Sequence, residues 1–355
     1  MKEEQNEAVV NQRLEFNCLT FACLFLIMES LNGDELCFPQ LNTSCKKPLL
    51  HHAKNILFDT LMSLICLMTV TLNMLVIFSI SYFRQLHTTT NLFLLSLAVS
   101  DFLVGIVLMP LQILSQRCWY LGSFMCGCFH YTSYIVTSAS VGNMVLISAD
   151  RYVAICDPLH YPTKVTQRKV KVCVCLCWAC SVLYNGVILK EFLKNPDQYN
   201  FCDGECVILL EYITQVFDMI FTFLSPITVI IVLYMRVFVV AVSQARAMRS
   251  HIAAVSQQGS VSVSVRKSER KAATAIGVVV VVFLICMFPY FVPTLAGNSM
   301  SFSPEFLVFV SWLFNCNSCL NPIIYAFFYP WFRKSVKLTV TLQILQPDCC
   351  DANIL

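Results

Sequence analysis

Seven long apolar stretches constrain this chain more than any other feature of its sequence. They lie at about 56–82, 91–115, 126–153, 171–191, 207–240, 272–296 and 304–328. Each is at least as long as the roughly 20 residues that a helix needs to cross a bilayer. Because lipid offers no partners for unpaired backbone groups, each stretch must be helical. The sequence therefore predicts an all-α membrane protein, built as a bundle of seven transmembrane helices.

The composition agrees with a polytopic membrane protein. Hydrophobic residues make up 57% of the chain and charged residues only 13%, with a mean hydropathy of +0.68. The net charge is +3, and no basic face of the kind that binds nucleic acid is visible. We find no metal-ligand cluster, nucleophile motif or phosphate-binding loop, so the sequence predicts neither an enzyme, a metal site nor an organic cofactor.

Basic residues in the connections give the orientation of the spans. They gather in the first, third and fifth connections and in the tail, whereas the opposite loops carry Asp197, Asp203 and Glu205. Because Lys and Arg mark the cytoplasmic side, the N-terminus is expected outside, with the protein in the plasma membrane. Asn42 starts an Asn-Thr-Ser glycosylation sequon on that outer side.

Three parts follow along the chain. Residues 1–55 form an extracellular segment, 56–328 the transmembrane bundle, and 329–355 an amphipathic helix with a cytoplasmic tail. Phe16–Ile27 is an apolar run of signal-peptide length, but its flank has no basic excess. Residues 1–27 are therefore either a biological leader or an artefact of a gene start upstream of Met28.

Asp150-Arg151-Tyr152 closes the cytoplasmic end of the third span. Arg151 can pair with Asp150, or reach Glu269 at the start of the sixth span. Such a pair would hold two helix ends together, and breaking it would open a cytoplasmic cleft. The alternative is an arginine that extends to the lipid headgroups.

The seventh span contains Asn321-Pro322, followed by Tyr325. Pro322 removes one backbone hydrogen bond and bends the helix. Asparagine inside a membrane needs polar partners, so we expect Asn321 to join a buried polar cluster. A sodium ion at Asp101 is a hypothesis for this cluster, whose other expected members are Asn73, Ser140, Asn317 and Ser318.

These landmarks resemble those of rhodopsin-like receptors over about residues 56–340. They include Asn73, Asp101, Asp150-Arg151-Tyr152, Trp178, Pro226, Tyr234, Pro289 and Asn321-Pro322. The run 317–332 and the segments 37–45 and 202–206 look like those of trace amine-associated receptors, the olfactory amine receptors. The resemblance implies a short amphipathic helix near 331–342 and a G-protein partner, of the stimulatory or olfactory type that raises cyclic AMP. It also implies the disulfides Cys126–Cys206 and Cys45–Cys202, unless some of these cysteines are free.

The resemblance also exposes a departure at the expected ligand site. Aminergic receptors hold the ligand ammonium with an Asp in span three, eighteen residues before the arginine. Eighteen residues are five helical turns, so this position shares the face of Arg151 and lies about 27 Å farther out. Here it is Ser133, and the tyrosine of span seven that supports the acid is replaced by Asn315.

A carboxylate occurs instead in the fifth span. Asp218 lies eight residues before Pro226 among apolar neighbours. A charge in such a stretch is costly and is a functional hypothesis by default. An ammonium ligand would satisfy Asp218 with a charge-assisted hydrogen bond, and some fish members of the family look similar. Alternatively, Asp218 bonds a neighbouring Ser, Thr or Tyr, or is protonated.

Aromatic and hydroxyl side chains are expected to complete the pocket. Tyr290, Phe291 and Trp312 can surround a cation, although such aromatic groups more often serve packing. Further polar contacts are expected from Tyr134, Thr137, Ser138 and Thr294.

The sixth span departs from the family at its switch. The family has Cys-Trp-x-Pro, whereas this chain has Cys286-Met287-Phe288-Pro289. Beneath Met287, the packing trio of Pro226, Val141 and Phe283 is retained. Helix motion is therefore expected to transmit the signal, with Tyr234 and Tyr325 as further switch residues.

Three alternatives to an amine receptor remain. The loss of an acid at Ser133 allows a receptor for a non-amine ligand, or a weakly signalling degenerate receptor. A transporter is a third class, but the sequence lacks two related halves with matching broken helices.

Overall fold

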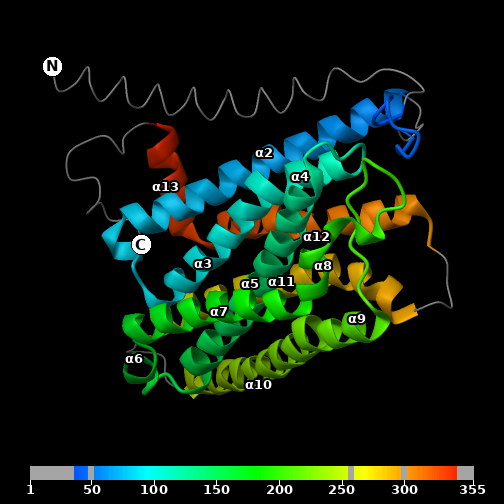
Figure 1. Ribbon diagram of the computed structural model, residues 1–355. Coiled ribbons are helices and arrows are strands. Elements are labelled where there is room, and N and C mark those ends of the chain that lie inside the picture. Colours follow the sequence, from blue (N-terminus) through cyan, green and yellow to red (C-terminus); the bar gives the residue numbers. More distant parts are fainter. Residues whose placement is uncertain (1–35, 47–51, 255–259, 297–301, 342–355) are drawn as a thin grey trace.

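The computed structural model describes residues 36–46, 52–254, 260–296 and 302–341 (Figure 1). Among these residues, helices predominate and seven long helical segments lie beside one another. The segments are α2 (His52–Tyr82), α3 to α4 (Thr89–Leu103, then the π-helical turn η2 at Val104–Leu108, then Met109–Ser115), α5 (Gly122–Cys156), α7 (Gln167–Ile188), α9 to α10 (Tyr212–Met219, then the π-helical turn η4 at Ile220–Leu224, then Ser225–Ala254), α11 (Ser260–Ala296) and α12 (Pro304–Phe328).

Shorter helices connect or follow these segments. They are η1 (Arg84–Leu86), α6 (Tyr161–Lys164), α8 (Lys190–Lys194), η3 (Pro196–Tyr199) and α13 (Pro330–Val340). The seven-helix architecture is as predicted, with ends that differ by several residues. α13 corresponds to the amphipathic helix expected near 331–342.

Six of the long segments are apolar and long enough to cross a membrane, and α5 is the exception. At 35 residues α5 has ample length, but it carries polar side chains along its course, including His130, Ser133 and Asn143. Its place explains this composition, because α5 packs against α3, α7 and α10 and so has little lipid-facing surface. A central span therefore needs less hydrophobicity than a peripheral one.

Local sequence signals fix where several helices begin. The hydroxyls of Thr88, Thr166 and Ser303 precede α3, α7 and α12, and each accepts a hydrogen bond from a backbone N–H of the first turn. Such caps satisfy donors that have no partner inside the helix.

The fifth span is interrupted by the π-helical turn η4. Pro226 follows this turn, and because proline has no N–H, the carbonyl of Thr222 loses its usual helical donor. Asp218 stands one residue before the end of α9, so the irregular turn lies directly beside the carboxylate of the predicted ligand site.

Among the described residues, three disulfides lie at one end of the bundle. Cys126–Cys206 and Cys45–Cys202 are the two pairs that the resemblance implied, and Cys37–Cys118 is a third pair that was not predicted. The segment 36–46 is thereby tied both to the end of α4 and to the loop before α9. Gly204 lets the loop before α9 approach the segment 36–46 closely, because its φ is +104° and an added Cβ would meet Cys37 Cβ at 2.9 Å. Asn42 of the sequon is exposed on this segment.

The opposite end of the bundle is held without disulfides among the described residues. There α13 lies against α2 and α12. Ser335 is fully buried on α13, and its hydroxyl donates to Ser79 Oγ on α2 at 2.5 Å. One end is thus covalently cross-linked, and the other depends on non-covalent contacts.

Candidate functional site

Asp218 lies within a group of tyrosines. Its side chain is half-buried, and Tyr184 on α7 donates a hydrogen bond to Oδ1 at 3.1 Å. Tyr134 on α5 and Tyr290 on α11 also interact electrostatically with the carboxylate. We call Asp218, Tyr134, Tyr184 and Tyr290 the acid–tyrosine group, and it draws on four of the long helical segments.

Tyr184 was missed by the sequence analysis, although its hydrogen bond is one that the alternative interpretation of Asp218 foresaw. It is a tyrosine inside an apolar run of span four, next to Asn185, and that pair of polar side chains was the available signal. A phenolic donor leaves Asp218 a hydrogen-bond acceptor and therefore does not exclude a cation beside it.

Asn315 and Trp312 lie in a different place, where α12 faces α2 and α4. Asn315 Nδ2 donates to Gln112 Oε1, and Trp312 Nε1 donates to Gln116 Oε1 at 3.3 Å. The Trp312 ring also meets Phe58 of α2 edge to face, with the ring centroids 6.2 Å apart. We call Gln112, Gln116, Trp312 and Asn315 the carboxamide corner. The two glutamines were missed, although both are polar residues four apart on one face of an apolar helix.

An ion pair flanks the carboxamide corner. Arg117 at the end of α4 pairs with Asp59 of α2, and both side chains are partly buried. Burial lowers the pKa of Arg117, yet an arginine keeps its charge at any physiological pH. The acid nearest to the corner is therefore already neutralised.

The other predicted ligand residues fall into two sets. Some contact neighbouring helices, and the others make no hydrogen bond with the described residues. Ser138 Oγ accepts a hydrogen bond from Asn185 Nδ2 at 3.0 Å, and Phe291 stacks on Phe223 with centroids 4.1 Å apart. These two are engaged with neighbouring helices. The side chains of Ser133, Thr137 and Thr294 are half-buried and make no hydrogen bond with the described residues.

The polar cluster around Asp101 forms between α2, α3 and α12. Asn321 Nδ2 donates to Asp101 Oδ2 at 2.8 Å, and Asn73 Nδ2 donates to the carbonyl of Ser318 at 2.9 Å. Ser140 bonds Ser100 at 3.0 Å, so it reaches the neighbour of Asp101 rather than Asp101 itself. Asn317 is buried as well.

Four acceptor oxygens in this cluster remain unpaired within the described residues. They are Asp101 Oδ1 and the Oδ1 atoms of Asn73, Asn317 and Asn321, and Asp101 is only 1% exposed. Unpaired oxygen ligands around a carboxylate fit a small hard cation such as sodium.

At the inner end, Arg151 pairs with Asp150. Asp150 also accepts hydrogen bonds from Thr90 Oγ1 at 2.9 Å and from the hydroxyl of Tyr161 at 2.7 Å. The side chain of Glu269, the second expected partner of Arg151, lies outside the described residues. Tyr161 of α6 was missed, since only the folded loop after span three brings it back to Asp150.

The connection that carries Tyr161 is itself braced. Lys164 and His160 both contact Asp157, and their hydrogen bonds hold the pKa of this partly exposed carboxyl down at about 2. Asp157 is thus charged throughout the physiological range. Tyr152 is half-buried beside this connection.

The expected switch residues of the sixth and seventh spans are buried. Met287, Phe283 and Val141 belong to one core cluster, together with Phe223 and Phe291. Tyr234 packs beside Gly277 of α11, and Tyr325 is only 1% exposed. Pro322 lies inside α12 as predicted.

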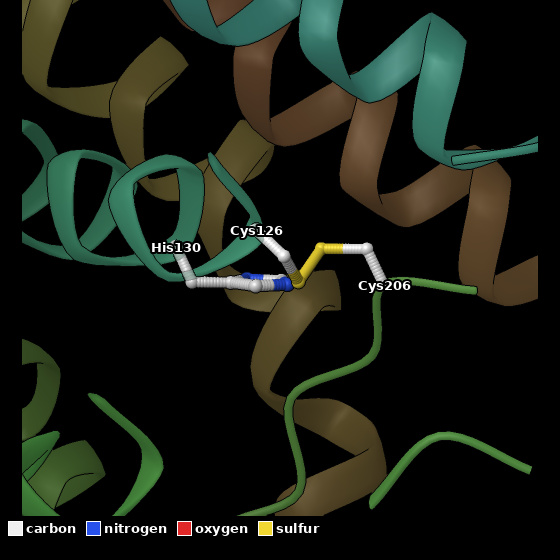
Figure 2. A group of neighbouring side chains, drawn as sticks. All are labelled: Cys126, His130 and Cys206. Atoms are coloured by element: carbon white, nitrogen blue, oxygen red, sulfur yellow. A yellow bond between two sulfur atoms is a disulfide. The ribbon is translucent and has the colours of Figure 1, made fainter. Parts of the chain in front are cut away.

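Among the described residues, two groups of side chains have the composition of a metal site, and in the group of Cys45, Cys202 and Glu205 the two sulfurs are joined in a disulfide. Cys126, His130 and Cys206 bring their ligand atoms within 4.8 Å of one another, and Figure 2 shows the His130 ring against the sulfur of Cys126. Both sulfurs are joined in the disulfide, so neither is a thiolate that could bind a metal. We therefore interpret the group as a histidine packed on a structural disulfide.

Comparison with known proteins gives one consistent result. The model of the seven-transmembrane receptors of the rhodopsin family matches residues 72–325. Trace amine-associated receptor 13c of Danio rerio is 36% identical over 93% of this chain and 98% of its own length. Trace amine-associated receptor 1 of Mus musculus is 36% identical over 81% of this chain and 90% of its own length, and receptor 8a of Rattus norvegicus is 34% identical over 88% and 94%.

Proposed function

The chain belongs to the rhodopsin family of seven-transmembrane receptors, among the trace amine-associated receptors, and on that premise we propose that it senses small amines through Asp218. This is a family of receptors rather than of enzymes. The acid–tyrosine group is the observation that carries the proposal. The ligand ammonium is proposed to bind the Asp218 carboxylate, with its apolar part directed toward Ser133 and Asn315.

The chemistry of the group supports an ammonium ligand. A half-buried carboxylate gains from a cationic partner, and a charge-assisted hydrogen bond is about twice as strong as a neutral one. Tyrosine rings attract a cation through their electron-rich faces. Ser133 offers no charge at the position where relatives of the aminergic type carry an acid, so Asp218 is the acid left for this task.

We propose that the N-terminus faces the outside of the plasma membrane. The distribution of Lys and Arg supports this orientation. The disulfides also support it, because the three of them occur at the predicted outer end, and disulfides persist on the oxidising side of a membrane.

Signalling is proposed to run through a stimulatory or olfactory G protein that raises cyclic AMP. Amine binding would shift α9 and α11 against each other, since both contribute to the acid–tyrosine group. At the inner end, Arg151 would leave Asp150 and free the cytoplasmic surface for the G protein. A sodium ion at Asp101 would favour the inactive arrangement of α3 and α12.

A cyclic AMP assay on cells that express the full chain tests this function. Each volatile amine is compared with the alcohol of the same carbon skeleton, and cells that lack the stimulatory G-protein α subunit serve as the control. We expect amines to raise cyclic AMP only where this subunit is present, and alcohols to be inactive. Activation by the alcohols, or by neither class in cells with verified surface expression, would favour the non-amine or silent receptor instead.

A further inference from the structure

We infer that the ligands this receptor prefers are monoamines with a neutral hydrogen-bonding group, such as a hydroxyl or a carboxamide, at the end opposite the ammonium. The inference rests on the proposed function, because it assumes that Asp218 holds the ammonium. It assigns the carboxamide corner as the site that recognises the other end of the ligand. It also predicts that diamines are poor ligands.

The carboxamide corner has unused hydrogen-bonding capacity. Gln112 and Asn315 are linked by one amide-to-amide hydrogen bond. Each amide offers one acceptor oxygen and one NH₂ donor, so a single bond between them leaves one of each over. This holds whichever way the two amides are flipped. The oxygen of Asn315 and the nitrogen of Gln112 make no hydrogen bond with the described residues.

Tyr290 connects the two ends of the proposed site. It interacts electrostatically with Asp218, and its ring packs on Phe314 of α12 with centroids 4.8 Å apart. Phe314 directly precedes Asn315 in the chain. A ligand whose ammonium is anchored at Asp218 can therefore run along Tyr290 toward Asn315 and Gln112. Ser133 on α5 adds a further neutral hydroxyl at the position that the family resemblance assigns to this side of the pocket.

A second ammonium finds no unpaired carboxylate beside the carboxamide corner among the described residues, because Asp59 is paired with Arg117. The acids of the loop before α9 are oriented by neutral donors, which leave their charge in place: Asp197 accepts from Ser123 and Asn200, Asp203 from Thr43, and Glu205 from the backbone of Phe201.

Glu211 is the exception at this end of the described chain, since its side chain makes no hydrogen bond. It is exposed just before α9, where water and salt screen its charge. The corner therefore pairs well with a neutral polar group and poorly with a cation, which would lose water without gaining a carboxylate.

A series of matched ligands tests the inference. At each chain length, the unbranched alkylamine, the amino alcohol and the diamine are compared in the cyclic AMP assay. A neutral hydrogen bond in a desolvated site corresponds to about tenfold in affinity. We expect the half-maximal concentration of the amino alcohol to be about tenfold below that of the alkylamine, and the diamine to be weaker than both.

Variants of the carboxamide corner show whether it causes the preference for the amino alcohol. Gln112→Leu and Asn315→Leu should abolish the preference, so that in each variant the half-maximal concentration of the amino alcohol equals that of the alkylamine. Gln198→Leu makes the same exchange at an exposed glutamine of η3 and should preserve the preference. A preference for the amino alcohol that survives both corner variants would overturn the inference.

Arg117→Gln provides a gain-of-function test. It releases Asp59 from its ion pair and supplies a free carboxylate beside the corner. We expect it to improve the diamine response at least about fivefold relative to the alkylamine. No gain for the diamine in a variant that reaches the surface would contradict the role given to this ion pair.

The outcomes separate this inference from the proposed function. If alkylamines act through Asp218 but diamines are the strongest ligands of the wild type, the carboxamide corner has been misassigned and the amine receptor stands. If alkylamines act equally well on Asp218→Asn, the proposed function fails, and the inference fails with it.

Discussion

The carboxylates Asp101 and Asp218 both lie in the helix bundle, and their surroundings differ sharply. Asp101 is 1% exposed and is held by Asn321 within a cluster that joins α2, α3 and α12. Asp218 is half-buried and accepts a hydrogen bond from Tyr184 of α7. The first arrangement ties helices together, whereas the second leaves a charge within reach of a ligand. The role of a buried acid thus depends on which groups its carboxylate can still contact.

The difference comes from helix packing, because both acids lie just before a π-helical turn. Asp101 precedes η2 and is covered by the packing of α2 and α12 against α3. Asp218 lies just before η4, where Pro226 removes a helical hydrogen bond and the helix widens. π-Helical turns of this kind occur often at functional sites, and they redirect the side chains beside them.

The largest effect is expected from Asp218→Asn, which removes the charge and keeps the size of the side chain. Truncating one partner of a buried charge pair costs at least about 3 kcal/mol, or more than about 100-fold in affinity. The half-maximal amine concentration in the cyclic AMP assay should rise by at least this factor, with surface expression unchanged. A shift below about threefold would mean that the ammonium binds elsewhere. Asp218 would then have no ligand-binding role that distinguishes it from Asp101.

Asp101→Asn should have a smaller and different effect. The amine still meets Asp218, so its half-maximal concentration should change less than about tenfold. In the wild type, replacing sodium by a bulky organic cation should improve amine potency, and in Asp101→Asn this dependence should vanish. Sodium dependence that persists in the variant would separate Asp101 from the ion.

Tyr184→Phe refines the account of Asp218. It removes a hydroxyl that donates to the carboxylate at 3.1 Å and keeps the ring. A hydrogen bond to a charged group contributes about 1.5–3 kcal/mol when it is fully desolvated, and this one is only half-buried. We expect amine potency to fall roughly three- to tenfold. A loss as large as that of Asp218→Asn would show that Tyr184 itself binds the ligand.

The smallest effect is expected from Ser138→Ala. The hydroxyl of Ser138 already accepts a hydrogen bond from Asn185, so it is directed toward α7 rather than toward a ligand. Amine potency should change by less than about threefold and thermal stability should change little, because the amide of Asn185 keeps the carbonyls of Tyr134 and Ser181 as acceptors. A tenfold loss of potency at full surface expression would return Ser138 to the ligand site.

Much of this contrast was predictable from the sequence, and the reasons are physical. Long apolar runs specify transmembrane helices, so the seven spans were predicted although their ends were not. A lone acid in such a run is conspicuous, which is why Asp101 and Asp218 were both singled out. Asp101 could also be matched with Asn321 and Asn73, because polar residues inside a membrane seek one another.

The partners on other helices were harder to predict. Tyr184 is 34 residues from Asp218, and Gln112 is 203 residues from Asn315, so only helix packing brings each pair together. The aromatic side chains expected to line one pocket lie in two places for the same reason. Tyr290 is near Asp218, and Trp312 is in the carboxamide corner. Cys37–Cys118 was missed because a chain with 20 cysteines allows many pairings, and spacing alone does not select among them.

The central claim is that Asp218, and not Asp101, binds the ligand ammonium. Saturation binding of a radiolabelled amine agonist to membranes from cells that express wild type, Asp218→Asn or Asp101→Asn tests it without relying on signalling. The account predicts that Asp101→Asn binds within about tenfold of wild type and that Asp218→Asn loses at least about 100-fold in affinity. Equal affinity of Asp218→Asn and wild type would contradict the claim.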